Sequence, residues 1–209
     1  MEYSHISNIA FKANRSLGLV KRSLHMCQQD ANALAYTSLV KSYLEYAWST
    51  WDPHTDSNKY KLEAVQHRVA RFVTRNYNWK IPGTSIVQEL GWKTLEQRRR
   101  KHSLELMIKV VNGQSGVNMS DYCNETTKRI TRHEKCYVPP QCRTDIYQQS
   151  YFPRTLREWN VLPPELVDSC NLDSFSAGLA RYLYDWALGH SIGPDGAVLL
   201  CRVNNWKFE

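Results

Sequence analysis

Hydrophobic residues recur every three or four positions through most of this chain, a spacing that predicts amphipathic α-helices. The clearest segment is 60–77, YKLEAVQHRVARFVTRNY, where apolar residues occupy one helical face and basic residues another. Helices of the same kind are expected over 5–26, 31–49, 84–90, 94–111, 153–162 and 173–186. The pattern therefore predicts a mainly α fold with a bundle-like arrangement of helices.

Turn and capping residues mark where several of these helices begin and end. Asp52 precedes a proline and closes the second helix, because the residue before proline avoids helical geometry. Gly91 and Gly113 stand where two later helices stop. Thr94 and Gln97 are spaced as a capping box. The other expected N-caps are Asp30, Asp56 or Ser57, and Asp173 or Ser174.

The presence or loss of helical periodicity along the sequence divides the chain into four regions. Residues 1–113 form a basic helical region, and residues 114–150 lose periodicity and collect Gly, Ser, Asn, Thr and Pro. We expect the second region to be an irregular linker or surface arm with room for one short strand. Residues 151–184 form a small C-terminal helical segment. Residues 185–209 have no consistent periodicity and form an atypical tail.

The positive charge of the chain is concentrated in its middle. The formal net charge of the 209 residues is +7. Residues 59–109 contain twelve Lys/Arg and four Asp/Glu, an excess of +8, whereas residues 1–58 contain five of each. Residues 158–209 contain three Lys/Arg and seven Asp/Glu, which gives −4. Such concentration favours a polyanionic partner.

The basic residues of segment 60–77 predict one cationic stripe. Lys61, Arg68 and Arg75 follow one another at seven-residue intervals, and Arg71 lies within one helical step of that line. At about 100° per residue, the four share a single solvent-facing stripe. A helix with one apolar and one cationic face suits a phosphate backbone, although a solvated helix face without a partner has the same pattern.

A second basic run, RRRK at 98–101, has the highest charge density in the chain. Four consecutive helical residues spread over more than a full turn, so they do not all face one ligand. We expect Arg98 and Lys101 to reach phosphates. The other two are expected to be solvated or to pair with Glu96 and Glu105.

The chain has seven tryptophans, which most often pack in cores or interfaces. Trp79 is the exception, because it lies in a polar and basic loop at 76–83. We expect this one tryptophan to be placed where it can stack on a nucleic-acid base.

Four potential metal ligands, Cys123, His133, Cys136 and Cys142, lie close together in the sequence. They form a weak zinc candidate, because they lack the tight CxxC pair of most structural zinc sites, and scattered loop cysteines explain them better. The sequence has no GxSxG, HExxH, GxGxxG or phosphate-binding glycine loop, and no adjacent aspartate pair. We therefore expect no catalytic residues, no cofactor and no enzyme activity from this chain by itself.

The cysteine and hydropathy patterns bear on location. Six cysteines at irregular spacings do not make a secreted disulfide framework. The first residues, MEYSHISNIAFKAN, lack the apolar core of a signal peptide, and no apolar run reaches membrane-spanning length. We expect an intracellular protein of the nucleus or cytoplasm that has no membrane partner.

Four blocks of the sequence occur in the same order in one known family. They are AYTSLVKSYLEYAWSTWDP (35–53), LEAVQHRVARFV (62–73), LGWKTLEQRRRKHSLELMIKVVNG (90–113) and YFPRTLREWNVLP (151–163). This order resembles the region downstream of the polymerase core in non-LTR retrotransposon reverse transcriptases of the jockey and CR1 type. The resemblance covers about residues 5–180. In that family an endonuclease and the polymerase fingers and palm, with the catalytic aspartates, precede this region.

The resemblance implies a post-palm, thumb and connector region that grips template RNA and nascent duplex by their backbones. Its partners would be RNA, RNA–DNA hybrid or duplex DNA, and the palm of the parent RNA-directed DNA polymerase. Residues 185–209 resemble nothing in the family, and we expect read-through or a chimeric exon there. Two alternatives stay open: a helical protein-interaction scaffold co-opted by a host, and a mobile-element remnant without a selected function.

Overall fold

The computed structural model describes residues 2–125, 133–169, 171–187, 190–192 and 198–200. In these ranges the chain is mainly helical, as the hydrophobic pattern predicted. It divides into two compact units, Met1–Arg100 and Lys101–Glu209. α7 (Leu95–Val111) begins in the first unit and continues in the second, whereas the first predicted region extends to residue 113.

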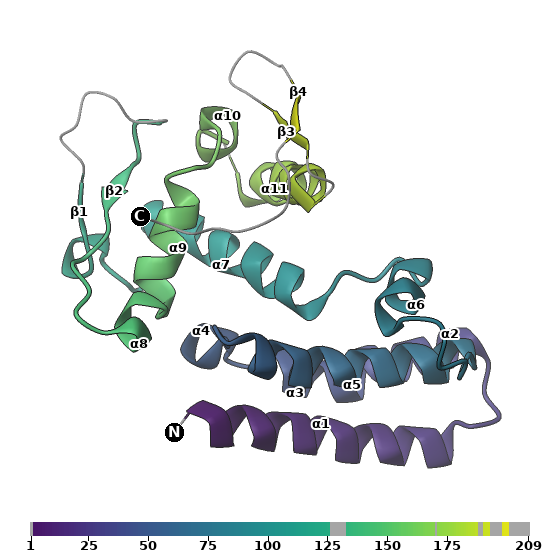
Figure 1. Cartoon of the computed structure of the whole chain (residues 1–209). Coiled ribbons are helices and arrows are strands. Elements are labelled where there is room, and N and C mark those ends of the chain that lie inside the picture. Colours follow the sequence, from purple (N-terminus) through teal and green to yellow (C-terminus); the bar gives the residue numbers. More distant parts are fainter. Residues whose placement is uncertain (1, 126–132, 170, 188–189, 193–197, 201–209) are drawn as a thin grey trace. The chain divides into compact units, whose positions relative to one another are not determined.

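Three long helical stretches make up most of the first unit (Figure 1). α1 (Glu2–Ser23) leads into a second stretch that returns antiparallel to it, and α5 (Asp56–Thr74) then runs alongside α1. α6 (Gly83–Glu89) packs on α5. The second stretch consists of α2 (Gln29–Ala35), η1 (Tyr36–Val40), α3 (Lys41–Glu45) and α4 (Trp48–Trp51).

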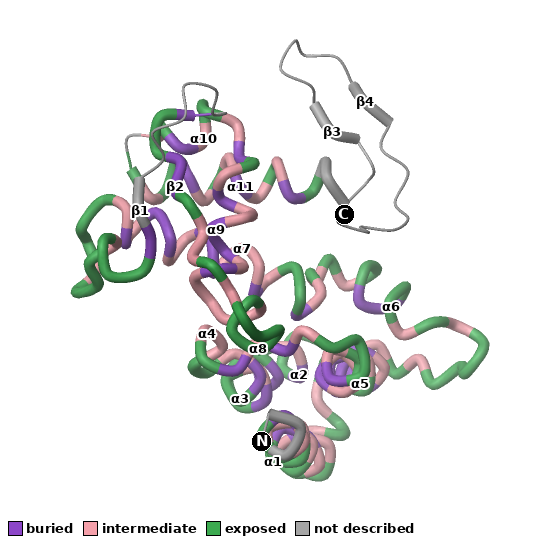
Figure 2. Tube along the Cα trace, turned by 60° about the vertical axis from the view of Figure 1, so that its left-hand side comes forward, coloured by how far each residue is buried: buried purple, intermediate pink, exposed green. Residues whose placement is uncertain are grey.

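The core of the first unit is built from the apolar helix faces that the sequence predicted. Buried positions recur through successive turns of α5 (Figure 2). At the edge of the core, Tyr36 stacks on Trp92 with 4.8 Å between the ring centroids. Each fully buried Leu, Ile or Val contributes roughly 1.5–3 kcal/mol. The main core residues are Ile6, Ala13, Leu17, Val20, Tyr36, Val40, Leu44, Trp51, Leu62, Val65, Val69 and Phe72.

The second stretch differs from the continuous helix predicted over 31–49. η1 is a π-helical turn, which changes the helical register of the residues that follow. A continuous helix through Tyr36 and Val40 would place Tyr43 on the same buried face, but Tyr43 is 46% exposed. The helix then breaks at Ala47, whose backbone is left-handed with φ of 51°. Trp51 Nε1 donates to the carbonyl of Tyr46 at 2.8 Å and secures the break.

Several predicted helix ends are confirmed. The capping box forms in both directions, because the Thr94 N–H donates to Gln97 Oε1 and the Gln97 N–H donates to Thr94 Oγ1, each at 3.2 Å. Gly91 and Gly113, which follow α6 and α7, have φ of 67° and 66°. Both glycines therefore occupy the left-handed conformation that ends a helix at low steric cost.

Three of the predicted N-caps are wrong. At α11 (Leu172–Ala187), Asn171 Oδ1 accepts the backbone N–H of Ser174 at 2.7 Å and takes the capping role. A periodic pattern locates a helix better than it locates its first residue. The observed caps are Gln28, Thr55 and Asn171, where Asp30, Asp56 or Ser57, and Asp173 or Ser174 were expected.

The second unit has its own core, formed by α7, α9 (Tyr151–Trp159) and α11. Leu156 and Trp159 are fully buried in α9, which overlaps the helix expected over 153–162 and begins two residues before it. A short helix that the sequence did not predict, α10 (Pro164–Val167), follows α9 and has a proline in its first turn. The remaining elements are η2 (Met119–Asp121), β1 (Asn124–Glu125), β2 (Tyr137–Val138), α8 (Asp145–Gln148), β3 (His190–Ile192) and β4 (Val198–Leu200).

The predicted linker at 114–150 lies within the second unit. β1 pairs antiparallel with β2, and Cys123 and Tyr137 belong to the core. Asn160 exchanges two hydrogen bonds with the backbone of Tyr137, at 3.1 and 2.7 Å. In the predicted tail at 185–209, α11 extends to Ala187 and β3 pairs antiparallel with β4. The rest of that tail lies outside the described residues.

Candidate nucleic-acid interface

Lys61 belongs to the predicted cationic stripe but does not present its charge to solvent. Its ammonium nitrogen is shielded from water. The acid nearby in sequence, Glu63, accepts the backbone N–H of Glu96 at 2.9 Å. Burial raises the pKa of Glu63, and hydrogen bonds from the backbone of Glu96 and Leu95 oppose the rise. The start of the predicted stripe is therefore not available to a phosphate.

Arg68 is exposed and lies beside α1. Its Nη1 donates to Asn14 Oδ1, a neutral acceptor, at 2.9 Å. Burial lowers the pKa of Lys21 in α1, and the positive charge of Arg68 lowers it further. The Lys21 ammonium lies 5.9 Å from the centroid of the Phe72 ring. Two cations thus stand close together where α1 meets α5.

Arg75 ends α5 on the same side. It is the C-cap residue, with a left-handed φ of 54°, and its side chain is exposed. Its Nη2 donates to the carbonyls of His25 and Cys27, at 3.3 and 3.0 Å, in the connection that follows α1. We refer to Lys21, Arg68 and Arg75 as the seam cations.

The seam cations are not compensated by acids. Among the described residues, none of the three forms an ion pair with a carboxylate, and their contacts are an amide oxygen, two backbone carbonyls and an aromatic ring. Neutral acceptors satisfy N–H donors without cancelling the charge. α1 adds the exposed side chains of Lys12, Arg15 and Arg22. This part of the first unit therefore carries net positive charge, the property that attracts a phosphate backbone.

Arg71 is separated from the seam cations by its contacts. Its Nη1 donates to the carbonyl of Asn78 at 2.8 Å, and its Nη2 donates to the carbonyl of Ile81 at 2.6 Å. Burial lowers the pKa of His67, and the charge of Arg71 lowers it further. Arg71 thus holds the loop after α5, while Arg68 and Arg75 contact α1 and its connection. The single stripe predicted from helical spacing is divided by the packing around α5.

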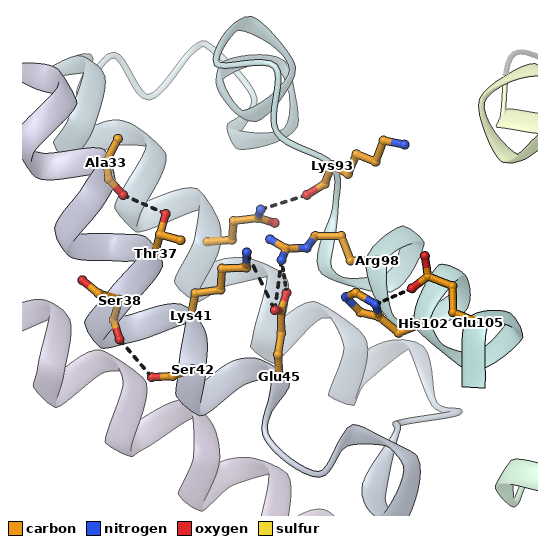
Figure 3. A network of polar contacts seen from close by, with 11 residues as sticks. Ala33, Thr37, Ser38, Lys41, Ser42, Glu45, Lys93, Arg98, His102 and Glu105 are labelled. Carbon is orange, nitrogen blue, oxygen red and sulfur yellow. Dashed lines mark hydrogen bonds and ion pairs between the residues drawn. The ribbon is translucent and has the colours of Figure 1, made fainter. Parts of the chain in front are cut away.

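Arg98 is bound to an acid of the second helical stretch (Figure 3). Its guanidinium lies 2.7 Å from Oε1 of Glu45, and the Lys41 ammonium lies 3.9 Å from the other oxygen, Oε2. The side chains of Arg98 and Glu45 are only 20% and 18% exposed. The prediction that Arg98 reaches phosphates is therefore not supported, because its charge is already paired.

Arg99 and Lys101 of the same basic run are paired as well. Arg99 is 1% exposed, and its Nε donates to Asp52 Oδ1 at 2.6 Å. In the second unit, the Lys101 ammonium lies 3.4 Å from a Glu105 oxygen. Three of the four residues in the densest basic run, Arg98, Arg99 and Lys101, thus neutralise carboxylates of the unit in which each lies.

Glu105 collects several donors within the second unit. Ser176 Oγ donates to its Oε1 at 2.6 Å, and His102 Nδ1 lies 3.0 Å from its Oε2. Burial alone would raise the pKa of Glu105, but these hydrogen bonds and the charge of Lys101 together lower it. The carboxylate is therefore kept ionised, and Lys101 is held as its partner rather than as a phosphate contact.

The weak zinc candidate is not assembled. His133 and Cys136 are neighbours, with Sγ 3.6 Å from both ring nitrogens, but His133 Nε2 also lies 3.1 Å from the Trp159 carbonyl. Cys123 and Cys142 instead contact backbone carbonyls close to them in sequence. The part of the chain that the structure describes contains no group of three or more His, Cys, Asp or Glu side chains suited to a metal ion.

Lys21 is the member of the interface that the sequence did not suggest. The pattern that could have indicated Lys21 is its seven-residue spacing from Asn14, which puts both residues at one border of the apolar face of α1.

Among the described residues, no helix is both long and apolar enough to cross a membrane. Comparisons with protein-family models, curated proteins and solved structures found no match to this chain.

Proposed function

We propose that the first unit binds the sugar–phosphate backbone of RNA, RNA–DNA hybrid or duplex DNA through the seam cations. The observation that supports this best is that Lys21, Arg68 and Arg75 carry positive charge without an acidic partner among the described residues. In addition, residues 64–88 contain four Lys/Arg and no Asp/Glu. Shape-based recognition of hybrid or duplex RNA requires such backbone contacts rather than base-reading side chains.

The resemblance to jockey- and CR1-type non-LTR retrotransposon reverse transcriptases supports a more specific form of the proposal. The chain is then the post-palm part of an RNA-directed DNA polymerase, without catalytic residues, that acts in the nucleus or cytoplasm beside the palm. Neither a cofactor nor a metal is needed for this role. The ordered sequence blocks at 35–53, 62–73, 90–113 and 151–163 carry this part of the proposal.

The proposal is tested by reversing the charge of all three seam cations to Glu in the full chain. Binding of a fluorescent RNA–DNA hybrid is measured by anisotropy at several salt concentrations. The slope of log affinity against log salt should fall by about 1 for each phosphate contact that is lost. Unchanged affinity and slope would contradict the proposal.

A control variant separates the position of the charges from their total. Lys93, Lys135 and Arg143 are exposed residues outside the seam. Changing these three to Glu alters the formal net charge by the same amount as the seam variant, three times −2, from +7 to +1. The control should retain most of the affinity. Equal losses in both variants would mean that binding follows total charge and not the seam.

A second candidate function, a protein-interaction scaffold, is favoured by a different observation. Leu39, Tyr43 and Tyr46 recur at helical spacing and are 48%, 46% and 80% exposed. Titration with the hybrid distinguishes the two functions, because a scaffold that binds an acidic protein would not saturate with hybrid at a defined stoichiometry.

The other alternative, a mobile-element remnant without a selected function, is tested by thermal unfolding. Cooperative unfolding of the isolated chain would argue against a remnant that no longer folds.

A further inference from the structure

The loop between α5 and α6, residues 75–82, exposes a tryptophan that no core accounts for. Trp79 is 83% exposed, whereas Trp51 and Trp159 are 8% and 0% exposed in the cores of their units. A ring of this size gains more from burial than any other side chain, so leaving it in water is costly. Packing against the described residues therefore does not account for its position.

The backbone on both sides of Trp79 is fixed. The two donors of Arg71 hold the carbonyls of Asn78 and Ile81. Asn76 Oδ1 accepts the N–H of Asn78 at 3.1 Å, and Asn78 Oδ1 accepts the N–H of Lys80 at 3.0 Å. Ile81 also packs against the buried cluster formed with α6. A braced loop loses little conformational freedom on binding, so an exposed ring at its tip is pre-organised for a ligand.

The charge around Trp79 indicates the chemistry of that ligand. The Lys80 ammonium lies 5.8 Å from the Trp79 ring centroid. Acidic residues are absent from residues 64–88, which include Arg71, Arg75 and Lys80. An aromatic face next to a cation matches one nucleotide, in which a flat base and a phosphate are joined within a short distance. In an acidic peptide the negative charge and any flat ring belong to different residues, so no single residue would match both groups.

We propose that Trp79 is a stacking platform for an unpaired base of single-stranded RNA or DNA, with Lys80 beside the adjacent phosphate. A base paired inside a duplex hides both faces in the stack, so the platform selects unpaired nucleotides. The inference rests on the proposed backbone binding by the seam cations and adds a preference to it. Arg75, which begins the loop, is also the last seam cation. Trp79 lies four residues after Arg75 in the protein, so a nucleic-acid strand that contacts Arg75 has the stacking platform close to it in the same loop.

Trp79→Ala in the full chain tests the platform. Affinity is measured for a short single strand that carries a fluorescent adenine analogue, and for a blunt duplex of the same sequence. The single strand should bind the variant roughly 5- to 150-fold more weakly than it binds the unaltered chain, and the duplex should bind both chains equally well. Quenching of the fluorescent base, which reports stacking on an aromatic ring, should be lost.

Two further variants control for aromatic character and for general surface effects. Trp79→Phe keeps an aromatic face and should retain most of the single-strand affinity and the quenching. Tyr46→Ala removes another aromatic side chain, 80% exposed, from a part of the first unit outside the loop. This second variant should bind both nucleic acids like the unaltered chain.

The possible outcomes separate this inference from the proposed function. If Trp79→Ala binds the single strand as well as the unaltered chain does, the platform is wrong, and a protein contact becomes the better explanation of the exposed ring. Equal weakening for single strand and duplex also overturns it, because stacking on unpaired bases predicts a selective loss. In either case, loss of duplex binding in the seam variant would still support backbone binding. If the unaltered chain binds neither nucleic acid, both proposals fail.

Discussion

Two groups of basic residues in the first unit have the same charge and opposite surroundings. Arg98 and Arg99 at the start of α7 lie 2.7 and 2.6 Å from the carboxylates of Glu45 and Asp52. The seam cations between α1 and α5 donate only to neutral oxygens or lie over a ring. A paired guanidinium holds the fold together and contributes little to the external field. An unpaired one leaves its field available to a ligand.

The comparison shows that charge density along a sequence does not measure available charge. RRRK at 98–101 is the densest basic run, yet Arg98 and Arg99 are paired with acids 53 and 47 residues away in the chain. No local pattern reveals partners at such separations. The seam, in contrast, combines two arginines of α5 that the helical spacing had already indicated with Lys21 of α1, which it had not.

The largest expected effect is on stability, at the buried pair. Arg99→Ala leaves the carboxylate of Asp52 without the guanidinium at 2.6 Å and should lower the free energy of unfolding by about 3–5 kcal/mol. Arg68→Ala, at an exposed position with a neutral acceptor, should change it by no more than ~0.5 kcal/mol. Urea unfolding followed by circular dichroism measures both. Similar small changes for the two variants would remove the distinction between the groups.

Smaller effects, opposite in kind, are expected for single glutamine variants of Arg98 and Arg68: the first should lower stability and the second should lower the salt dependence of binding. Arg98→Gln weakens the contact with the largely buried Glu45 and should cost about 1–3 kcal/mol of stability, with no change in the salt dependence of nucleic-acid binding. Arg68→Gln should leave stability nearly unchanged and should lower the salt slope by about 1. Both variants remove one positive charge, so each is the control for the other. A lower salt slope for Arg98→Gln would contradict the assignment of that arginine to the fold.

Much of the fold was predictable because it depends on local pattern. The apolar faces of α1, α5 and α7, the Thr94–Gln97 capping box and the glycines after α6 and α7 all follow from short-range spacing. The π-helical turn at Tyr36–Val40 and the break at Ala47 were missed, because packing and not periodicity sets them. α10 was missed because four residues do not establish a helical period.

The candidate site was predictable only in part. Helical spacing placed Arg68 and Arg75 on one side of α5, and both are exposed. It also placed Lys61 and Arg71 there, but the Lys61 ammonium is buried, and Arg71 contacts the loop after α5 instead of α1. Lys21 was missed because the interface needs a second helix, and a pattern within α5 contains no information about α1. Which cations remain available is decided by contacts between elements.

The smallest expected effect is on the pKa values of two lysines, one beside each group of arginines. The pKa of Lys21 lies below 10.5, first because of burial and then because of Arg68, so Arg68→Gln should raise it without restoring 10.5. For Lys41, burial and Arg98 lower the pKa while Glu45 raises it. Arg98→Gln should therefore raise the Lys41 pKa too, with Glu45 then acting on Lys41 alone. NMR titration of lysine side-chain signals measures both shifts.

The direction of the linked stability change follows from these shifts. A lysine with a lower pKa in the folded state binds fewer protons there than in the unfolded chain, so the free energy of unfolding rises as the pH climbs from the folded value toward 10.5. The rise should be flatter in Arg68→Gln, because the pKa of Lys21 is then closer to that of the unfolded chain. If the Lys21 pKa does not move in this variant, the charge of Arg68 is already neutralised by a group near it. The seam would then be compensated like the start of α7, and the contrast on which backbone binding depends would be lost.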